Sequence, residues 1–383
     1  MSSSRGKPPN RSEAELHQLQ RSGDLQVLPA AEFREQVRSK GLEAAFRSTH
    51  VVVASEACLT HQATLILHLG PSDPPIRVRQ FRLGSAEGSG GHGNTDLVVP
   101  INQGGATALG DLLAGRALPL VLSGNPSRQQ PRLELETELR LDQIDGGRLL
   151  LHRGINENGV VAFSSREGIT PTPWGPVLGP WGSGLVSSPG PGSIGLSMPG
   201  LQQLGLGSPV MVAGAIGWVS GAGSGHQPNP KRSALGHALS PGACCAVDVN
   251  LHDLQPQWLR ATRLPDGSTG LMVAMAAPVL LLTLQQAEQL AVSPDELEVP
   301  LIDYGVPRRV RPSPTSVSYG ELSKGSIRWG EQQLLVAPAH SPRLAAEIAE
   351  CLSHQLRSGA FPLRLPFAAL PERSSPRGLN ERP

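Results

Sequence analysis

The chain has 383 residues, and its 33 basic and 32 acidic side chains give a formal net charge of +1. This balance argues against nucleic-acid and membrane partners, which require an excess of one sign of charge. Aromatic residues make up 3% of the chain, which also argues against stacking on nucleic-acid bases. The 44 glycines and 36 prolines favour many turns, so we predict an α+β fold of β-rich mixed sheets with peripheral helices and long Gly/Pro-rich loops.

The four cysteines, at positions 58, 244, 245 and 351, are too few for a disulfide framework in a chain of this size. The first residues lack the apolar segment of a secretory signal. The longest apolar run, 271–284, contains Pro278 and is too short to span a bilayer. We therefore expect a soluble cytoplasmic protein.

Helices are predicted near the start of the chain. Residues 1–11 are polar and are expected to form a disordered tail, as are residues 371–383. Ser12 and Glu15 form a capping box for a short helix that ends at Gly23, and two further short helices follow it.

Strands are predicted to dominate from there to about residue 165. Short apolar runs bounded by turn residues indicate strands at 51–53, 65–69, 76–83 and 118–122. In 132–141 apolar and polar residues alternate, so we expect one face of that strand to be buried and the other to be in water. A short helix over 106–113 is the exception.

Residues 12–370 are expected to form one domain, which can be divided into two lobes of about residues 12–165 and 209–370. The segment between the lobes, 168–208, is rich in Gly, Pro and Ser. We predict an ordered long loop there, with a short helix near residues 201–204, because a disordered insert rarely holds the two tryptophans that this one carries.

After residue 250 we predict helices and strands in alternation. They are a helix from Pro256, strands at 271–277 and 299–303, a hairpin at 326–336, and a final helix that begins at Ser341-Pro342 and ends at Gly359.

One stretch, 209–250, concentrates unusual residues. Two short apolar runs, which we interpret as buried strands, flank a loop rich in glycine and serine that carries His226. A basic turn follows the loop, and Cys244 and Cys245 lie in the second run. The stretch therefore offers backbone N–H groups, cations, an imidazole and two thiols, which are the groups that a binding or catalytic site uses.

Thiols are the first candidates for chemistry, because a thiolate is a strong nucleophile and can carry transferable sulfur. Cys244 and Cys245 are more simply interpreted as packing in a buried strand, and at most one of them can face the loop. Cys58 follows a buried strand and precedes His61 by three residues, which gives a usable pair of nucleophile and base. Cys351 is expected in the core.

Other motifs are weaker. The cysteines and histidines of the middle stretch lack the spacing of a zinc site. Residues 88–93 match G-x-G-x-x-G, but no helix is predicted after them, so we interpret them as a flexible loop. Arg308 and Arg309 suit a carboxylate or phosphate ligand, and a solvated turn or an ion pair with Asp303 is equally compatible.

Several motifs occur in a recognisable order along the chain. They are Ser72-Asp73-Pro74-Pro75-Ile76, Gly104-Gly105-Ala106 with 111–115, 213–217 with 225–228, 256–260, and Asp303-Tyr304 with Pro307-Arg308-Arg309. In this order and spacing the chain resembles the homocysteine biosynthesis family over roughly residues 12–370. The resemblance implies a sulfurtransferase of methionine biosynthesis, which inserts sulfur into L-aspartate semialdehyde by means of a persulfide-type cysteine and two electrons.

The resemblance also implies partners. It implies a small-molecule substrate, no cofactor bound in this chain, and an external iron–sulfur electron donor of the ferredoxin-like kind. It gives no role to nucleic acid or membrane, and a homo-oligomer is compatible with it.

Site residues follow from the resemblance and the motifs together. We expect Cys58 to be the sulfur-carrying nucleophile and His61 or His226 to be the proton shuttle. The expected substrate-binding residues are Ser72, Asp73, Gly104, Gly105, Asn158, Arg308 and Arg309, with Arg308 or Arg309 as the clamp on the substrate carboxylate.

A second cysteine of the family is expected within 124–132, where this chain has none. Cys244 and Cys245 are therefore secondary thiol candidates. The alternative hypothesis is a binding or regulatory relative, which keeps the fold and an anion pocket but has lost or altered the chemistry.

Overall fold

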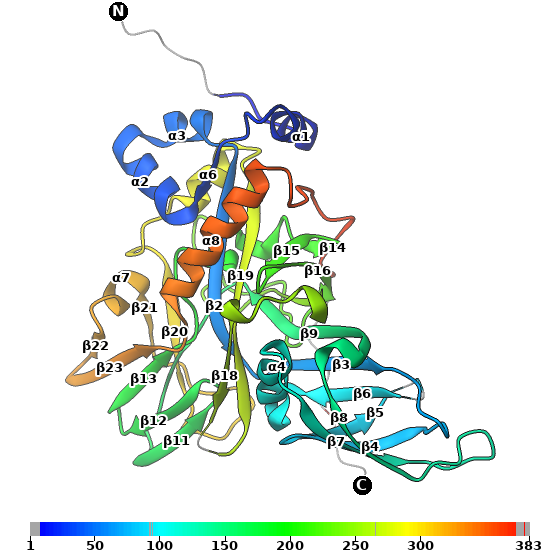
Figure 1. The fold of residues 1–383 in the computed structure, drawn as a ribbon. Coiled ribbons are helices and arrows are strands. Elements are labelled where there is room, and N and C mark those ends of the chain that lie inside the picture. The colour runs from blue at the N-terminus through cyan, green and yellow to red at the C-terminus, as the bar shows by residue number, and fades with distance from the viewer. Residues whose placement is uncertain (1–7, 92, 94, 265, 373–378, 380–383) are drawn as a thin grey trace, which may run out of the picture.

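A computed structural model describes residues 8–91, 93, 95–264, 266–372 and 379. A 14-stranded sheet forms the centre of the molecule (Figure 1). In the order in which they pair, its strands are β1 (Val27–Pro29), β2 (Val51–Thr60), β19 (Thr269–Leu280), β15 (Pro209–Val212), β16 (Ala215–Ala222), β17 (Cys244–Asn250), β9 (Ile144–Asn156), β3 (Ala63–Leu69), β6 (Asp96–Pro100), β5 (Ala86–Gly90), β4 (Val78–Leu83), β7 (Leu118–Gly124) and β8 (Glu134–Leu139), with β18 (Leu259–Arg263) paired beside β19.

A second sheet of six strands lies beside the first. Its order is β21 (Ser316–Ser318), β20 (Glu298–Asp303), β10 (Val161–Phe163), β13 (Ser183–Val186), β23 (Gln332–Pro338) and β22 (Ser326–Trp329). Two small antiparallel pairs complete the strands, and they are β11 (Gly168–Thr172) with β12 (Gly175–Gly179) and β14 (Gly205–Leu206) with β24 (Ala368–Ala369).

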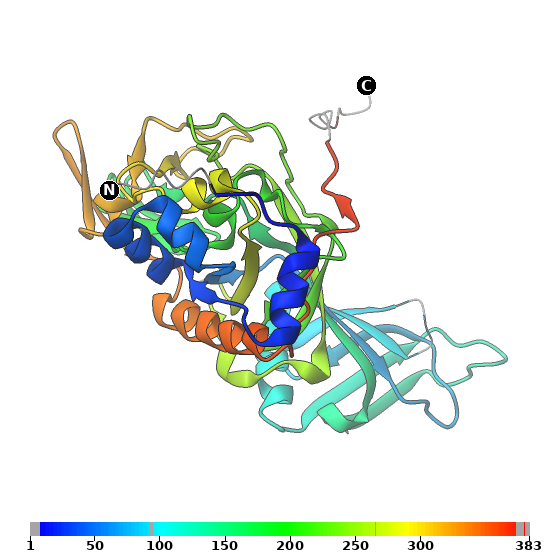
Figure 2. The same ribbon diagram turned by 90° about the horizontal axis from the view of Figure 1, so that it is seen from above.

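The helices lie on the outside of these sheets. They are α1 (Glu13–Ser22), α2 (Ala30–Lys40), α3 (Leu42–Ser48), α4 (Ala106–Leu113), α5 (Ile194–Ser197), α6 (Leu284–Leu290), α7 (Tyr319–Leu322) and α8 (Pro342–Arg357). Figures 1 and 2 show α1, α2, α3 and α8 gathered at one end, while β3 to β8 extend away from them. Within the described ranges, no helix has the length and apolar character needed to cross a membrane.

The ladder between β2 and β19 organises the larger sheet. Ten residue pairs join the two strands, from Val51 opposite Leu280 to Thr60 opposite Leu271. Both strands are apolar over most of their length because α8 covers one side of them with a stripe that includes Leu344, Ile348 and Leu352.

The predicted fold class is confirmed, since the structure is an α+β, β-rich arrangement of mixed sheets with few helices. The capping box of Ser12 with Glu15 and the helix over 106–113 are also confirmed. The final helix begins after its predicted cap, Ser341, whose hydroxyl accepts the N–H of Leu344. These features depend on interactions between residues close together in the chain, so they can be predicted from the sequence.

Three predictions of elements are wrong. The segment 168–208 is not a long loop, because it contributes β11, β12, β13 and α5. Its α-helix lies at 194–197, and only a 3-10 turn, Pro199–Leu201, adjoins the helix predicted near 201–204. Its many small residues concealed the hairpin, in which Ile169 pairs with Leu178. The helix predicted from Pro256 is a single 3-10 turn.

Two further differences involve β8 and β5. The strand predicted at 132–141 is shorter, and its predicted buried face is only partly covered at this edge of the sheet, since Leu139 is buried and Leu135 half-buried while Thr137 is exposed. In the motif 88–93, Gly88 and Gly90 belong to β5, where they pair with neighbouring strands, while His92 lies outside the described residues.

The predicted tails fall mostly outside the described residues, at 1–7 and from 373 onward apart from residue 379. Arg11, which was assigned to the first tail, is held against the body. Its Nη1 donates to the carbonyl of Thr49 at 2.7 Å, and its guanidinium stacks 4.2 Å from the ring centre of Phe46.

Candidate functional site

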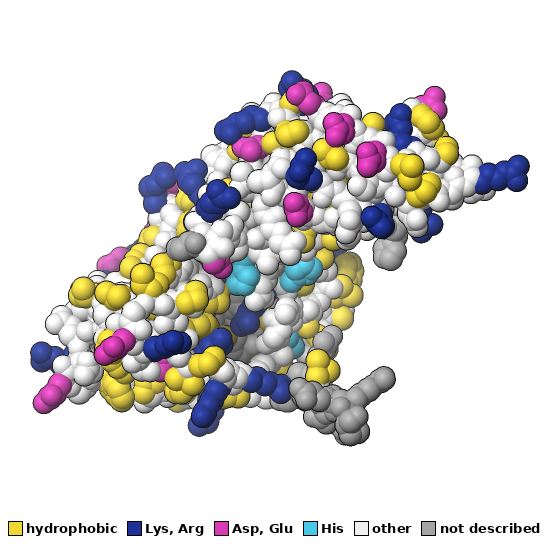
Figure 3. All heavy atoms as spheres, turned by 90° about the horizontal axis from the view of Figure 1, so that it is seen from below, with side chains coloured by type: hydrophobic (Ala, Val, Ile, Leu, Met, Phe, Trp, Pro, Cys, Tyr) yellow, Lys and Arg dark blue, Asp and Glu magenta, His cyan; other side chains and the backbone are white. Residues whose placement is uncertain are grey.

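A cavity of about 640 Å³ lies beside the end of β2. Its walls come from β2, from β9, from the turn of the β11–β12 hairpin, from the segment after β13, and from the loops after β18 and β20. Figure 3 shows that one face of the molecule is hollowed, with histidine side chains beside the hollow. Segments that are far apart in the sequence thus meet in one place, which is a common property of binding sites.

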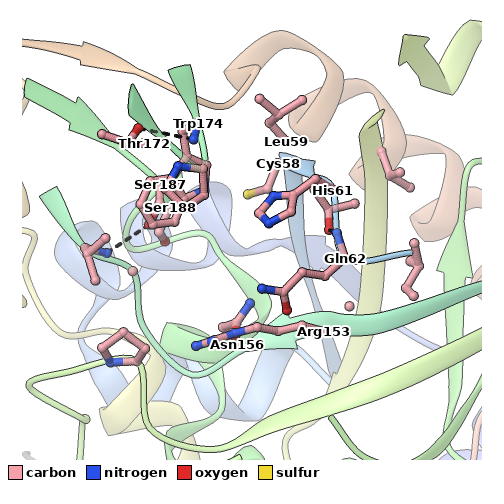
Figure 4. Close-up of a pocket in the computed structure, with 18 of the residues that line it drawn as sticks. Cys58, Leu59, His61, Gln62, Arg153, Asn156, Thr172, Trp174, Ser187 and Ser188 are labelled. Carbon is pink, nitrogen blue, oxygen red and sulfur yellow. Dashed lines mark hydrogen bonds between the residues drawn. The ribbon is translucent and has the colours of Figure 1, made fainter. Parts of the chain in front are cut away.

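The thiol of Cys58 points into this cavity (Figure 4). Side chains on a strand alternate between its two faces, so Glu56, Cys58 and Thr60 share the face of β2 that lines the cavity. On the neighbouring β19, Val273 lies directly opposite Cys58 and lines the cavity with it. The backbone of Cys58 is also bridged to His340 on the other side, so the thiol sits on a fixed framework.

The thiol of Cys58 is neutral in the resting cavity. Burial raises its pKa well above the ordinary value for cysteine, and the neighbouring carboxyl of Glu56 raises it further. Among the described groups, no cation lowers the pKa of this thiol. Cys58 therefore differs from cysteines that are kept as thiolates, and it requires a proton acceptor or a bound sulfur atom before it can react.

His61 lies beside Cys58 in the same cavity, as the sequence predicts (Figure 4). Burial lowers the pKa of its imidazole, and the charge of Asp266 raises it in part. The imidazole is therefore mainly neutral at pH 7, with one ring nitrogen able to accept a proton. The two residues that the spacing of 58 and 61 predicts as nucleophile and base thus line one cavity, and their roles stay a prediction.

Two arginines reach the cavity, and neither was predicted. Arg153 comes from β9, and its Nε donates to the side chain of Asn156. Arg311 lies with its guanidinium 4.4 Å from the ring centre of Tyr304. Among the residues that the structure describes, no carboxylate forms an ion pair with either guanidinium. Both therefore remain available to an anionic ligand.

The predicted clamp, Arg308 and Arg309, is not in the cavity. Both side chains are exposed, and neither lines the wall. The chain after β20 turns so that Tyr304 and Arg311, although Arg311 is exposed, line the cavity, while Arg308 and Arg309 at the turn do not. The sequence shows that a cluster of arginines follows this strand, but it does not show which of their side chains points into the cavity.

Four other predicted substrate residues also lie elsewhere. Ser72 and Asp73 belong to the connection between β3 and β4, where the hydroxyl of Ser72 donates to the carbonyl of Pro74. Gly104 and Gly105 line no part of this cavity.

Gly104 has a local structural reason to be glycine. Its φ is +84°, and a Cβ there would collide with the carbonyl oxygen of Ser85. Its N–H donates to the hydroxyl of Thr269 at 3.1 Å. The Gly104-Gly105 pair is thus explained by a tight turn that packs closely on a neighbouring strand.

The loop that carries His226 folds back on β17 instead of entering the cavity. Nδ1 of His226 lies 3.1 Å from the backbone nitrogen and 3.0 Å from the carbonyl oxygen of Cys244, and Nε2 lies 3.0 Å from the carbonyl oxygen of Pro371. Both ring nitrogens are therefore engaged with backbone groups. The expectation that His226 and Cys58 share one site is wrong.

Cys244 and Cys245 also lie outside the cavity wall. The thiol of Cys244 faces the loop and donates to the carbonyl of Ser224 at 3.3 Å, while Cys245 is part of the hydrophobic core. Burial raises the pKa of both thiols. As the alternation of a strand requires, only one of the two faces the loop, and core packing is the better interpretation of both.

Asn158 is at the cavity as predicted, but its side chain is committed to the protein. The amide donates to the carbonyls of Ala238 and Glu298, and its oxygen accepts the N–H of Gly159 and the hydroxyl of Tyr319. All of its usual hydrogen bonds are made, so we assign it to positioning the wall and not to holding the substrate.

A buried ion pair fastens the middle loop to the wall of the site. Glu157, which is 1% exposed, accepts a bidentate contact from Arg232 and the N–H groups of Gly200 and Ala243. Because breaking a buried pair leaves a cation without its partner, the Glu157→Gln variant should lose about 3 kcal/mol of unfolding free energy. Urea denaturation would measure the loss.

The matched control for this stability prediction is Glu347→Gln. Glu347 pairs with Arg343 on the surface of α8, where both side chains are largely exposed. Its loss should change the unfolding free energy by less than about 0.5 kcal/mol. Equal losses in the two variants would show that the buried pair does not fasten the loop.

The comparisons with known proteins agree with one another. The family model described as "Homocysteine biosynthesis enzyme, sulfur-incorporation" matches residues 25–363. The chain is 26% identical to an L-aspartate semialdehyde sulfurtransferase of Methanocaldococcus jannaschii, over 91% of this chain and 70% of that protein. It is also 26% identical to the protein of the same name in Methanosarcina acetivorans, over 96% of this chain and 74% of that protein. No solved structure matches the chain.

Proposed function

The chain belongs to the homocysteine biosynthesis family of sulfur-incorporating enzymes, and from that premise we propose that its cavity inserts sulfur into L-aspartate semialdehyde through a persulfide on Cys58. One observation supports this proposal most strongly. Cys58 is the only cysteine among the described residues that line the cavity, and it shares that cavity with two guanidinium groups that have no carboxylate partner. A nucleophilic sulfur and an anion site are the two requirements for such a substrate.

The substrate fits the charges of the cavity. L-aspartate semialdehyde has a carboxylate at one end and an aldehyde at the other. Arg153 or Arg311 would bind the carboxylate through charge-assisted hydrogen bonds, which leaves the aldehyde free to approach Cys58. This assignment replaces Arg308 and Arg309 as the clamp.

The electron balance depends on the form in which sulfur arrives. Conversion of the aldehyde to a thiol with sulfide consumes two electrons and two protons and releases water. If the sulfur is the outer atom of a persulfide, two more electrons and two more protons are needed to separate it from Cys58. The terminal sulfur would add to the aldehyde carbon, and a reductant would then cleave the S–S bond.

The electrons would come from an external reductant, and an iron–sulfur protein of the ferredoxin-like kind remains our proposal for it. Neutral His61 would accept the proton of the incoming sulfur nucleophile and return it to the carbonyl oxygen, which leaves as water. Both roles use a group that faces the cavity beside the thiol.

The direct test combines product formation with the state of the thiol. The purified protein should form homocysteine from L-aspartate semialdehyde, sulfide and a reductant. After incubation with a sulfur donor, and before substrate is added, mass spectrometry of the Cys58 peptide should show a gain of one sulfur atom. Sulfur on the peptides of Cys244 or Cys245 instead would contradict the assignment.

A binding or regulatory relative is the second candidate. It is favoured by the turn between β7 and β8, residues 124–132, where the second family cysteine is expected. That turn holds no cysteine and does not line the cavity. Binding of L-aspartate semialdehyde without homocysteine formation under any reductant would support this candidate.

A further inference from the structure

Glu56 is a buried carboxyl in the cavity wall to which the proposed reaction has so far given no role. It is 5% exposed, and its Oε2 accepts the N–H of Ile194 at 3.3 Å. Within the part of the chain that the structure describes, no lysine, arginine or histidine forms an ion pair with it. A buried carboxyl without a cation is costly when charged, so burial raises its pKa to about 8.

Geometry links Glu56 to Cys58. The two residues are separated by one position on β2, so their side chains leave the same face about 7 Å apart. Both line the cavity, and the residues opposite them on β19, Met275 and Val273, are apolar. A carboxyl and a thiol that enter one cavity at this spacing can exchange a proton directly or through one water molecule.

We propose that Glu56 is the proton donor that releases sulfur from Cys58. This inference rests on the proposed function, in which Cys58 carries a persulfide. Sγ of Cys58 must then depart each time the outer sulfur atom is handed on. A thiolate left in this apolar place beside a carboxyl is a poor leaving group, since thiols with high pKa leave slowly.

The step balances as a transfer from one thiol to another. A thiol acceptor forms a bond to the outer sulfur, the bond between that sulfur and Sγ breaks, and Sγ takes the electron pair. Glu56 gives its proton to Sγ, and its carboxylate then regains the proton that the acceptor thiol lost. No net oxidation or reduction occurs, and the products are the free Cys58 thiol and a persulfide on the acceptor.

The other groups around the cavity do not provide this proton. Burial lowers the pKa of His61 and raises that of Tyr304, and hydrogen bonds from Ser268 lower the pKa of Asp266. The guanidinium groups of Arg153 and Arg311 keep their protons near neutral pH. Burial raises the pKa of Cys58, Cys245 and Tyr319, and the negative charge of Glu56 raises the pKa of each of them further.

Two rates measured on Glu56→Gln test the inference. Cys58 is first loaded with sulfur by inorganic polysulfide, and transfer to a small thiol such as 2-mercaptoethanol is followed by the mass of the protein. This rate should fall on the order of 10²-fold, because the amide has no acidic proton. In contrast, alkylation of unloaded Cys58 by iodoacetamide at pH 9 should become several-fold faster, because a negative charge beside the thiol is removed.

A structural role alone would not move the two rates in opposite directions. The conservative variant Glu56→Asp keeps an acid farther from Sγ and should recover part of the transfer rate. Glu136→Gln, on the exposed strand β8, is the matched control and should change neither rate. Transfer at the unaltered rate in Glu56→Gln, or a parallel change in both rates, would overturn the inference.

The pH dependence of thermal unfolding shows whether Glu56→Gln is correctly folded. Because the pKa of Glu56 is higher in the folded than in the unfolded protein, its contribution to stability is complete below about pH 4.5 and is lost as the pH rises through about 8. Glu56→Gln lacks this loss, so at pH 9 it should melt no lower than the parent protein. Failure of the parent Cys58 to accept sulfur would contradict the proposed function itself, whereas normal loading with unaltered transfer would contradict only the role of Glu56.

Discussion

The Cys58→Ser variant should lose homocysteine formation by a factor on the order of 10³ or more, while its folding is unchanged. Serine has nearly the shape of cysteine, and the site is half-buried at the mouth of the cavity, so packing is preserved. A hydroxyl forms no persulfide, so the proposed route has no carrier for sulfur. The measurement is a single-turnover assay with L-aspartate semialdehyde and a polysulfide donor, with homocysteine as the detected product.

Cys351→Ser is the matched control for this variant. Cys351 is the other half-buried cysteine, but it lies on α8 and accepts a weak contact from the amide of Gln355 at 3.9 Å. Its activity should stay within about twofold of that of the parent protein, as is usual for changes far from the chemistry. Full activity of Cys58→Ser would remove the persulfide on Cys58 from the mechanism and leave the substrate to react with free sulfide.

The parts of the site that sequence could predict are those that are local in the chain. Cys58 and His61 are three residues apart at the end of an apolar strand, so their meeting needs no knowledge of the fold. Glu56 was within reach of the same reasoning, since alternation along β2 places it on the face of Cys58. It was missed because a single acidic residue in an apolar run matches no sequence motif.

Arg153 and Arg311 could not be predicted in the same way. Arg153 reaches the cavity because β9 pairs with both β17 and β3 in the large sheet, and those pairings join residues far apart in the sequence, such as Asn250 with Arg148 and Leu69 with Ile144. The position of the Arg311 side chain depends on the path of an irregular segment. In such a segment a backbone rotation at one residue can turn a side chain from the cavity to the solvent. Long-range register and loop direction are set by the whole sheet and not by local propensity.

The same contrast explains why the middle stretch misled. His226 and Cys244 lie near each other, as their sequence suggests, because β16 and β17 form an antiparallel pair around the loop. Their polar groups, however, satisfy one another and the backbone, so nothing remains to meet a ligand. A concentration of functional groups in sequence marks a site only when the fold leaves those groups without internal partners.

Arg153→Met should raise the KM for L-aspartate semialdehyde on the order of 10²-fold and change kcat much less. Arg153 is held by its Nε bond to Asn156 and lines the cavity, and no described carboxylate pairs with its guanidinium. Methionine keeps much of the length of the side chain but removes the charge, so the substrate carboxylate would enter the cavity unpaired. The measurement is the dependence of the initial rate on substrate concentration, with sulfur donor and reductant in excess.

Two further variants decide whether the charge or its direction matters. Arg153→Lys keeps a cation but loses the planar fork, so its KM should fall between those of the parent and the methionine variant. Arg308→Met removes an exposed cation outside the cavity wall and should leave KM within about twofold of the parent value. Equal KM values for Arg153→Met and Arg308→Met would mean that net charge near the entrance attracts the substrate from solution. A KM raised only in Arg153→Met would mean that the carboxylate is bound at one defined place, from which the aldehyde reaches the thiol of Cys58.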